Sequence, residues 1–286
     1  MDRATEPAAG KGKPRPALFR ALGKKDPPTG IVVAGRPYRR VEIFKHDSWA
    51  ATALYTDDVT TLVCKFNRIE PILGLPTGWL GQWLADREAY FYRTLADLPG
   101  IPAGCGPIHV DGAVMPNAVG HAFVDGRPLK ESDRLPPSFF DDLRQQLAVI
   151  HERGIAYMDL HKRENIILGS DGRGYLIDFQ VSMRVSPESW LAPARWLVNA
   201  FQQGDQYHLA KHQLRLGQSS PEEMEKMLDA ARPTWIRAHR VIAQPLRALR
   251  RRLLVALGIR KGLGKAQSEH FTEDGLLAET TPRRAA

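Results

Sequence analysis

The residues best suited to chemistry lie between Ile155 and Met183. Asp159 and Asn165 fall in a predicted loop, and Asp178 comes directly after a short apolar run that is typical of a strand. A strand on either side of a tight turn would bring both carboxylates and the amide to one end of a small hairpin. Phosphoryl transfer uses such a set, because a carboxylate orients the acceptor hydroxyl and oxygen ligands bind magnesium. This segment therefore predicts phosphoryl-transfer chemistry.

Each of these residues also has a simpler interpretation. Asn165 could be a turn-forming amide, and His161 could be a surface histidine as well as a metal or phosphate contact. Asp178 is harder to explain in this way, because a carboxylate between an apolar strand and Phe179 is costly unless it is paired or metal-bound.

A lysine and a glutamate upstream complete the charged set. Lys65 ends the apolar run Leu62–Cys64, and Glu88 falls on a predicted helix. Lys65 alone could be a solvated edge residue, and Glu88 could belong to a solvated charged face, with Glu70 as the alternative partner. In the company of Asp159 and Asp178, Lys65 is a candidate to bind phosphate groups, and Glu88 and Glu70 are the candidate partners for its charge.

The first half of the chain reads as strands followed by one helix. Alternating apolar residues predict strands in an antiparallel meander over residues 41–44, 52–55 and 60–66. A helix is expected from about Trp79 to Leu98, before Pro99-Gly100, and a short hairpin is expected to turn at Asp111-Gly112.

The second half has helical character. Ser138 and Asp141 predict a capping box, after which Leu143, Leu147 and Ile150 share one face, and Gly154 is expected to end this helix. Strands first and helices later predict an α+β fold of two unlike lobes. The expected organisation is a flexible basic leader (1–30), an N-lobe (31–124), a C-lobe (125–262) and a flexible tail (263–286).

These motifs resemble protein kinases in their order and approximate spacing over residues 38–215. The matching motifs are the catalytic loop with Asp159 and Asn165, the metal-binding pair Asp178-Phe179, and the strand Leu62-Val63-Cys64-Lys65. The resemblance implies a protein-kinase-like fold with a small antiparallel-sheet N-lobe and a mainly helical C-lobe.

The same resemblance implies a role for each residue. Lys65 would bind the ATP phosphates, Glu88 would orient Lys65, Asp159 would position the acceptor hydroxyl, and Asn165 with Asp178 would bind Mg²⁺.

Two further regions follow from the resemblance. Ala122 and Val124, within His121–Val124, would line the adenine site through backbone groups. Asp205 resembles a buried aspartate that braces the catalytic loop.

The sequence departs from the common eukaryotic protein-kinase pattern, and these departures narrow the resemblance to a subfamily. The loop expected to cover the phosphates, residues 46–51, has no glycine; Tyr157-Met158 replaces the usual His-Arg pair; and five residues separate Asp159 from Asn165 where four are usual. Gln180 replaces a glycine, and no Ala-Pro-Glu motif follows. The compact form is similar to bacterial lipopolysaccharide-core (Kdo and heptose) kinases and RIO-like kinases, which implies a lipid-linked sugar hydroxyl or protein Ser/Thr as acceptor.

Composition excludes several other classes of protein. Two cysteines, Cys64 and Cys105, cannot form a disulfide scaffold, and no run of about 18 apolar residues occurs, so a cytoplasmic protein is expected. The net charge of +8 suits acidic partners or an ATP-binding enzyme, but specific nucleic-acid binding would require a reading module that the sequence lacks.

The segment 245–258 predicts a basic amphipathic helix, either packed on the C-lobe or attached at the inner face of an anionic membrane. Two function classes stay open: an active kinase, and a pseudokinase scaffold with little or no turnover.

Overall fold

The computed structural model describes residues 17–216 together with 226, 228 and 233. The chain forms two compact units: a sheet unit, which runs to Ala89 and resumes over Gly104–Phe123, and a helical unit, which contains Tyr90–Ala103 and the chain from Val124. The second change of unit lies one residue from the expected lobe boundary, whereas the excursion of residues 90–103 into the helical unit was not anticipated.

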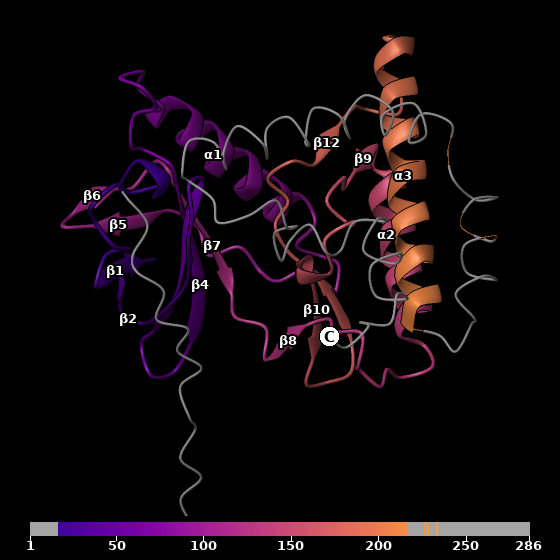
Figure 1. Ribbon diagram of the computed structural model, residues 1–286, viewed down its shortest axis with the longest axis horizontal. Helices are drawn as coiled ribbons and strands as arrows, with labels where there is room; N and C mark the ends of the chain where they lie inside the picture. Colours follow the sequence, from indigo (N-terminus) through magenta and orange to yellow (C-terminus); the bar gives the residue numbers. More distant parts are fainter. Residues whose placement is uncertain (1–16, 217–225, 227, 229–232, 234–286) are drawn as a thin grey trace, which may run out of the picture. The chain divides into compact units, whose positions relative to one another are not determined.

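The sheet unit is built on one antiparallel sheet. Its seven strands are ordered β6-β5-β1-β2-β3-β4-β7 (Figure 1). Their bounds are β1 Gly30–Val33, β2 Arg36–His46, β3 Ala50–Thr56, β4 Thr61–Asn67, β5 Ile108–Val110, β6 Ala113–Val114 and β7 Ala118–Ala122. The predicted meander is therefore confirmed as β2, β3 and β4, and the predicted hairpin as β5 and β6.

Alternation along β4 sets the direction of its side chains. Leu62, Cys64 and Phe66 are buried in the core of this unit, while Val63 and Lys65 alternate with them and point to the opposite face. Because β4 pairs with β3 on one side and with the edge strand β7 on the other, the backbone at Lys65 is held on both sides.

The expected flexible leader is wrong for residues 17–29. A short 3₁₀ helix, η1 (Ala17–Phe19), precedes Ala21 and Leu22, which are buried. The N–H group of Ala21 donates to the carbonyl of Asp47, and the carbonyl of Ala21 accepts from Ile69. The apolar run here is only a few residues long, too short to give a periodic signal among prolines and basic residues.

Helix α1 (Gly78–Thr94) begins as predicted and ends four residues before the expected Leu98. Its residues up to Ala89 belong to the sheet unit. Gly81 brings this helix against the chain that leaves β4: a Cβ at Gly81 would overlap the carbonyl oxygen of Arg68 and lie 3.2 Å from its carbonyl carbon. Only glycine permits this approach.

The close approach at Gly81 gives a stability prediction. Gly81→Ala is expected to lower the free energy of unfolding by roughly 1–3 kcal/mol, because the backbone of Arg68 must move. Gly78→Ala, on the same helix, has nothing within 4 Å of its new Cβ and should leave stability unchanged or slightly raised. Chemical denaturation of both variants checks this, and equal behaviour would contradict it.

The helical unit contains two long helices, α2 (Phe139–Glu152) and α3 (Ala192–Leu216) (Figure 1). It also contains the sheet β11-β10-β8 (Gly174–Leu176, Ile166–Gly169, Gly126–Pro128) and the pair β12-β9 (Met183–Arg184, Ile155–Ala156). The predicted hairpin around Asp171-Gly172 is confirmed as β10 and β11. The predicted α+β class, with an antiparallel-sheet part and a mainly helical part, is confirmed.

The ends of α2 test two local predictions. Leu143, Leu147 and Ile150 are buried, and the helix ends before Gly154, which has φ +70°, as expected. The capping box is wrong, because Ser138 makes no side-chain cap hydrogen bond and its hydroxyl bonds Asp142 instead.

Candidate functional site

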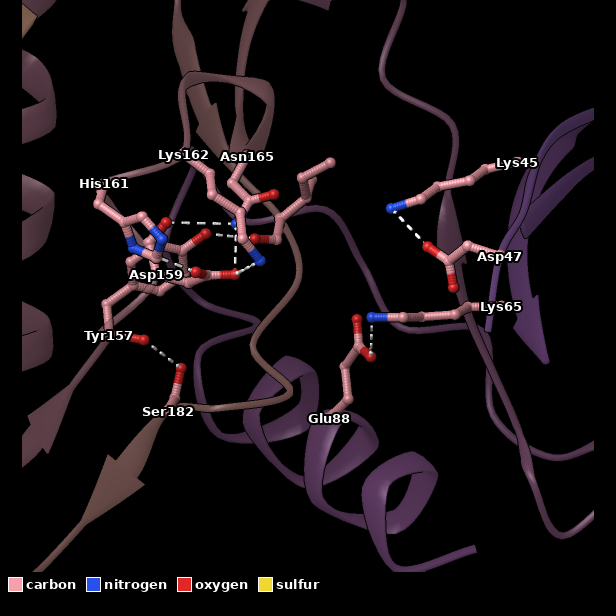
Figure 2. A network of polar contacts seen from close by, with 11 residues as sticks. Lys45, Asp47, Lys65, Glu88, Tyr157, Asp159, His161, Lys162, Asn165 and Ser182 are labelled. Carbon is pink, nitrogen blue, oxygen red and sulfur yellow. Dashed lines mark hydrogen bonds and ion pairs between the residues drawn. The ribbon is translucent and has the colours of Figure 1, made fainter. Parts of the chain in front are cut away.

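In the sheet unit, Lys65 and Glu88 form the predicted ion pair. The Lys65 Nζ lies 3.0 Å from the Glu88 Oε2, and the two side chains are 14% and 3% exposed (Figure 2). Lys65 is held by β4 and Glu88 by α1, whose path past β4 depends on Gly81. Glu70, the alternative partner, lies beside Gly23 instead.

The turn at residues 46–51 differs from a phosphate-binding loop. The Asp47 Oδ1 accepts hydrogen bonds from the N–H groups of Trp49 (2.8 Å) and Ala50 (3.0 Å), and its Oδ2 lies 2.9 Å from the Lys45 Nζ (Figure 2). Burial raises the pKa of Asp47, but Lys45 and the two N–H groups outweigh burial and leave this pKa below its usual value. These two N–H groups are therefore committed to an internal carboxylate.

In the helical unit, Asp159 is the centre of a polar cluster. Its Oδ2 accepts from the Lys162 Nζ (2.7 Å) and the Asn165 Nδ2 (2.8 Å), and its Oδ1 lies 3.3 Å from the His161 Nδ1 (Figure 2). Asp159 and Asn165 are both buried. Burial lowers the pKa of Lys162, but the charge and hydrogen bond of Asp159 outweigh this and raise it overall.

The additional residue between Asp159 and Asn165 is absorbed by two consecutive turns. The N–H of Lys162 donates to the carbonyl of Asp159, and the N–H of Asn165 donates to the carbonyl of Lys162 within the 3₁₀ turn η2 (Arg163–Asn165). The Asn165 amide therefore still reaches Asp159, and its Nδ2 donates in that contact, which leaves its Oδ1 oriented as an acceptor.

Asp178 follows β11 and belongs to the same cluster. The N–H of Ile177 donates to the carbonyl of Asn165 (3.1 Å), which places Asp178 next to that residue. Asp178 itself has φ +62°, a left-handed conformation that aspartate tolerates, and its N–H donates to the Tyr92 hydroxyl (3.3 Å). The backbone at Asp178 therefore lies beside Asn165, whose side chain contacts Asp159.

Phe179 fixes the position of this turn. Its ring is fully buried, with ring centroids 5.0 Å from Tyr157, 5.5 Å from Tyr92 and 6.3 Å from Phe91. Such aromatic packing leaves the preceding residue little freedom to move.

Asp205, on α3, braces the loop as the resemblance implied. It is buried, and its carboxylate accepts from the N–H groups of Tyr157 and Met158, both at 2.7 Å, and lies 3.2 Å from the His151 Nε2. Burial raises the pKa of Asp205, opposed by these three donors. Met158 has φ +69°, which is costly for this residue type, so Asp205 stabilises the strained backbone directly before Asp159.

His212 lies two turns further along α3 than Asp205, also supports the loop, and should make stability depend on pH. Its buried Nε2–H donates to the carbonyl of Leu160 (2.7 Å). Burial lowers the pKa of His212 to about 3, so the folded protein binds fewer protons than the unfolded chain. The contribution is complete above pH 6.5 and is lost as the pH falls, by about 2 kcal/mol at pH 5.

The measurement is thermal unfolding at pH 7.5 and pH 5 for the wild type and His212→Gln, which keeps a donor but cannot titrate. A smaller loss of stability in His212→Gln is expected. Equal losses in the two proteins would contradict the assignment to His212.

The two predicted adenine contacts differ in their backbone groups. The carbonyl of Ala122 is 2.8 Å from the His121 Nδ1 and is already engaged. Among the described residues, the structure records no hydrogen bond to the backbone of Val124.

Lys162 was not predicted as a site residue, although it contacts Asp159 as closely as Asn165 does. The sequence signal that could have identified Lys162 is its position three residues after Asp159, a spacing that brings side chains together in consecutive turns. No group of three or more His, Cys, Asp or Glu residues in the described chain could hold a metal. Magnesium commonly uses only one or two protein carboxylates besides phosphate oxygens and water, so Asn165 and Asp178 remain a chemically suitable pair.

Comparison with known proteins gives a likeness in fold. No family model matches the chain, and no curated protein matches it. Among solved structures, it is similar to the Rio2 kinase-ADP/Mg²⁺-phosphoaspartate complex from Chaetomium thermophilum, with 16% sequence identity and a TM-score of 0.47. The match covers 66% of this chain and 63% of that chain.

Proposed function

We propose that the protein is an ATP- and Mg²⁺-dependent phosphotransferase that acts on a hydroxyl group. The observation that supports this most directly is the hydrogen-bonded cluster of Asp159, Lys162 and Asn165, with Asp178 held beside it by the Ile177–Asn165 backbone bond. ATP with Mg²⁺ would supply the phosphoryl group, and the four side chains provide a base, a cation and two oxygen ligands.

Each residue has one role in the proposed reaction. The Asp159 carboxylate orients the acceptor hydroxyl and takes its proton as the oxygen bonds to the γ-phosphorus and ADP leaves. Lys162 places a positive charge where negative charge develops. Asn165 and Asp178 bind magnesium through oxygen atoms, and Lys65, oriented by Glu88, binds the ATP phosphates.

We propose that the adenine base is bound through backbone groups of two residues. Val124 offers a backbone N–H and C=O for adenine, whereas at Ala122 the N–H group is the better candidate because His121 already engages the carbonyl.

The chemical class of the acceptor is proposed from the resemblance to lipopolysaccharide-core and RIO-like kinases, and not from the described geometry. A hydroxyl on a lipid-linked sugar, or on protein Ser/Thr, fits an Asp159 base equally well. The predicted basic helix at 245–258 lies outside the described residues. A cytoplasmic enzyme with a contact at the inner membrane face remains our proposal. In the described part of the chain, none of the helices has the length and apolar character needed to cross a membrane.

One observation favours a second candidate function, a pseudokinase scaffold with little or no turnover. At the turn where kinases cradle phosphates with backbone N–H groups, Asp47 already accepts those of Trp49 and Ala50 and adds negative charge. A scaffold would bind ATP weakly and would not turn it over.

The deciding experiment compares the wild type with Asp178→Ala for magnesium-dependent ATP binding and ADP release. We expect the wild type to bind and hydrolyse ATP slowly, and the variant to lose both while its melting temperature without nucleotide stays close to the wild-type value. Binding without turnover, also after addition of lipopolysaccharide-core or protein acceptors, would favour the scaffold. Absence of any magnesium-dependent binding would overturn the ATP assignment.

A further inference from the structure

Two buried tyrosine hydroxyls meet at a single peptide group of the helical unit, the one that joins Ile177 to Asp178. The Tyr157 hydroxyl donates to the carbonyl of Ile177, and the N–H of Asp178 donates to the Tyr92 hydroxyl at 3.3 Å. Because the peptide bond is planar, this carbonyl and this N–H move as one rigid group. Each polar end of the group is therefore held by one hydroxyl, and we call this arrangement the peptide clamp.

Ring packing alone does not require tyrosine at either position. Both rings meet Phe179 edge-on, with centroids 5.0 Å (Tyr157) and 5.5 Å (Tyr92) from its ring and an interplanar angle of 75° in each case. Phenylalanine would make the same ring contacts without a hydroxyl. Tyr157 and Tyr92 are 0% and 1% exposed, and burial of a hydroxyl costs free energy unless it finds a hydrogen-bond partner. The peptide group before Phe179 supplies that partner for both hydroxyls.

The clamped peptide group controls how the chain turns at Asp178. Asp178 has φ +62°, in the left-handed region, which aspartate tolerates but does not prefer. Rotation of the peptide group toward a more relaxed backbone would stretch both clamp hydrogen bonds at once. The direction of the Cα–Cβ bond depends on φ, so the clamp also fixes the direction in which the Asp178 side chain leaves the backbone.

The donor side of the clamp is itself held firmly. The N–H of Tyr157 donates to Asp205 (2.7 Å), and its carbonyl accepts from the hydroxyl of the buried Ser182 (3.0 Å; Figure 2). Burial, together with the charges of Asp159 and Asp178, raises the pKa of the Tyr157 phenol well above its usual value. The hydroxyl therefore stays protonated and keeps the proton that the clamp needs.

We propose that Tyr92 and Tyr157 are positioning residues for Asp178, because their hydroxyls hold the peptide group before it in an orientation that presents the Asp178 carboxylate to Mg²⁺. Neither hydroxyl contacts the metal or the nucleotide in this proposal, and both act through the backbone. The magnesium role of Asp178 rests on the function proposed above. The clamp itself needs no metal and can be tested in the metal-free chain.

The first test is hydrogen exchange of residues 175–183 in the full chain without metal or nucleotide. In Tyr92→Phe the Asp178 N–H loses its acceptor, and in Tyr157→Phe the carbonyl of the same peptide group is released. Both variants should therefore exchange the Asp178 amide roughly tenfold faster or more.

Tyr55→Phe is the matched control, because it also removes a buried tyrosine hydroxyl that is bonded to the backbone. Tyr55 is fully buried in the sheet unit, and its hydroxyl donates to the carbonyl of Pro28 at 2.8 Å. All three single variants should lower the melting temperature by similar, small amounts, since each loses one buried hydrogen bond. Exchange at Asp178 should become faster only in the two clamp variants, Tyr92→Phe and Tyr157→Phe.

The second test is a magnesium titration at fixed ATP, followed by the shift in melting temperature, which requires no turnover. The half-saturating Mg²⁺ concentration should rise roughly tenfold in each clamp variant and stay unchanged in Tyr55→Phe. A higher Mg²⁺ concentration should restore the full shift in the clamp variants, because the carboxylate itself is still present. Asp178→Ala should not be rescued in this way.

The outcomes separate a positioning role from a purely structural one. Faster exchange at Asp178 together with a higher magnesium requirement supports the proposal. Unchanged exchange in both clamp variants would overturn it, as would faster exchange with an unchanged magnesium requirement, because the hydroxyls would then serve stability alone. A wild type without any magnesium-dependent shift would overturn the function proposed above, and the exchange result would still support or overturn the clamp.

Discussion

Asp159→Asn is expected to lower kcat by roughly 10²–10⁴-fold while the affinity for ATP changes little. Asparagine has the same shape but cannot take a proton from the acceptor hydroxyl. It also brings an amide toward Lys162 and Asn165, which both donate to the Asp159 Oδ2 at 2.7 and 2.8 Å. The loss should therefore appear in turnover and not in nucleotide binding, since the proposed phosphate and metal contacts are other residues.

The measurement is ADP release at saturating ATP, with binding followed separately by calorimetry. Asp111→Asn is a matched control, because Asp111 is an exposed turn residue at φ +50°, where asparagine is equally suitable. A variant at Asp159 that keeps wild-type turnover would remove this residue from the chemistry. Loss of ATP binding with full retention of the fold would assign it to the nucleotide site instead.

Local patterns predicted much of the fold. Alternation predicted β3 and β4, and the apolar spacing of Leu143, Leu147 and Ile150 predicted the buried face of α2, because both depend on neighbours in the chain. The packing of residues 17–29 could not be predicted in this way. Ala21 is paired by backbone hydrogen bonds with residues 47 and 69, and Leu22 packs in the core of the sheet unit; such long-range contacts leave no periodic signal.

The candidate site could also be predicted only in part from the sequence. The resemblance to protein kinases predicted the Lys65–Glu88 pair, and the predicted hairpin brought Asn165 and Asp178 to the same end as Asp159. The sequence was not sufficient to predict contacts that depend on backbone N–H groups, which every residue carries. The commitment of the Trp49 and Ala50 N–H groups to Asp47 is of this kind, as is the hydrogen bond from Asp178 to Tyr92.

The Lys65–Glu88 pair allows the structural and chemical contributions of Lys65 to be separated. Lys65→Met is expected to abolish turnover and to destabilise the fold by about 3 kcal/mol, because Glu88, only 3% exposed, loses its cationic partner in a place where water cannot replace it. Glu88→Met alone should destabilise less, since Lys65 is the more exposed of the two and can reach water.

The double variant, Lys65→Met with Glu88→Met, gives the decisive comparison. Replacing both charges by apolar groups removes the buried ion and its desolvation cost together, so stability should return to near the wild-type value. Turnover should stay absent, because the cation proposed to bind the ATP phosphates has been removed. Recovery of stability without activity would assign Lys65 to the chemistry. A double variant as unstable as Lys65→Met would show that the loss of activity reflects misfolding, and recovery of turnover would exclude Lys65 from phosphate binding.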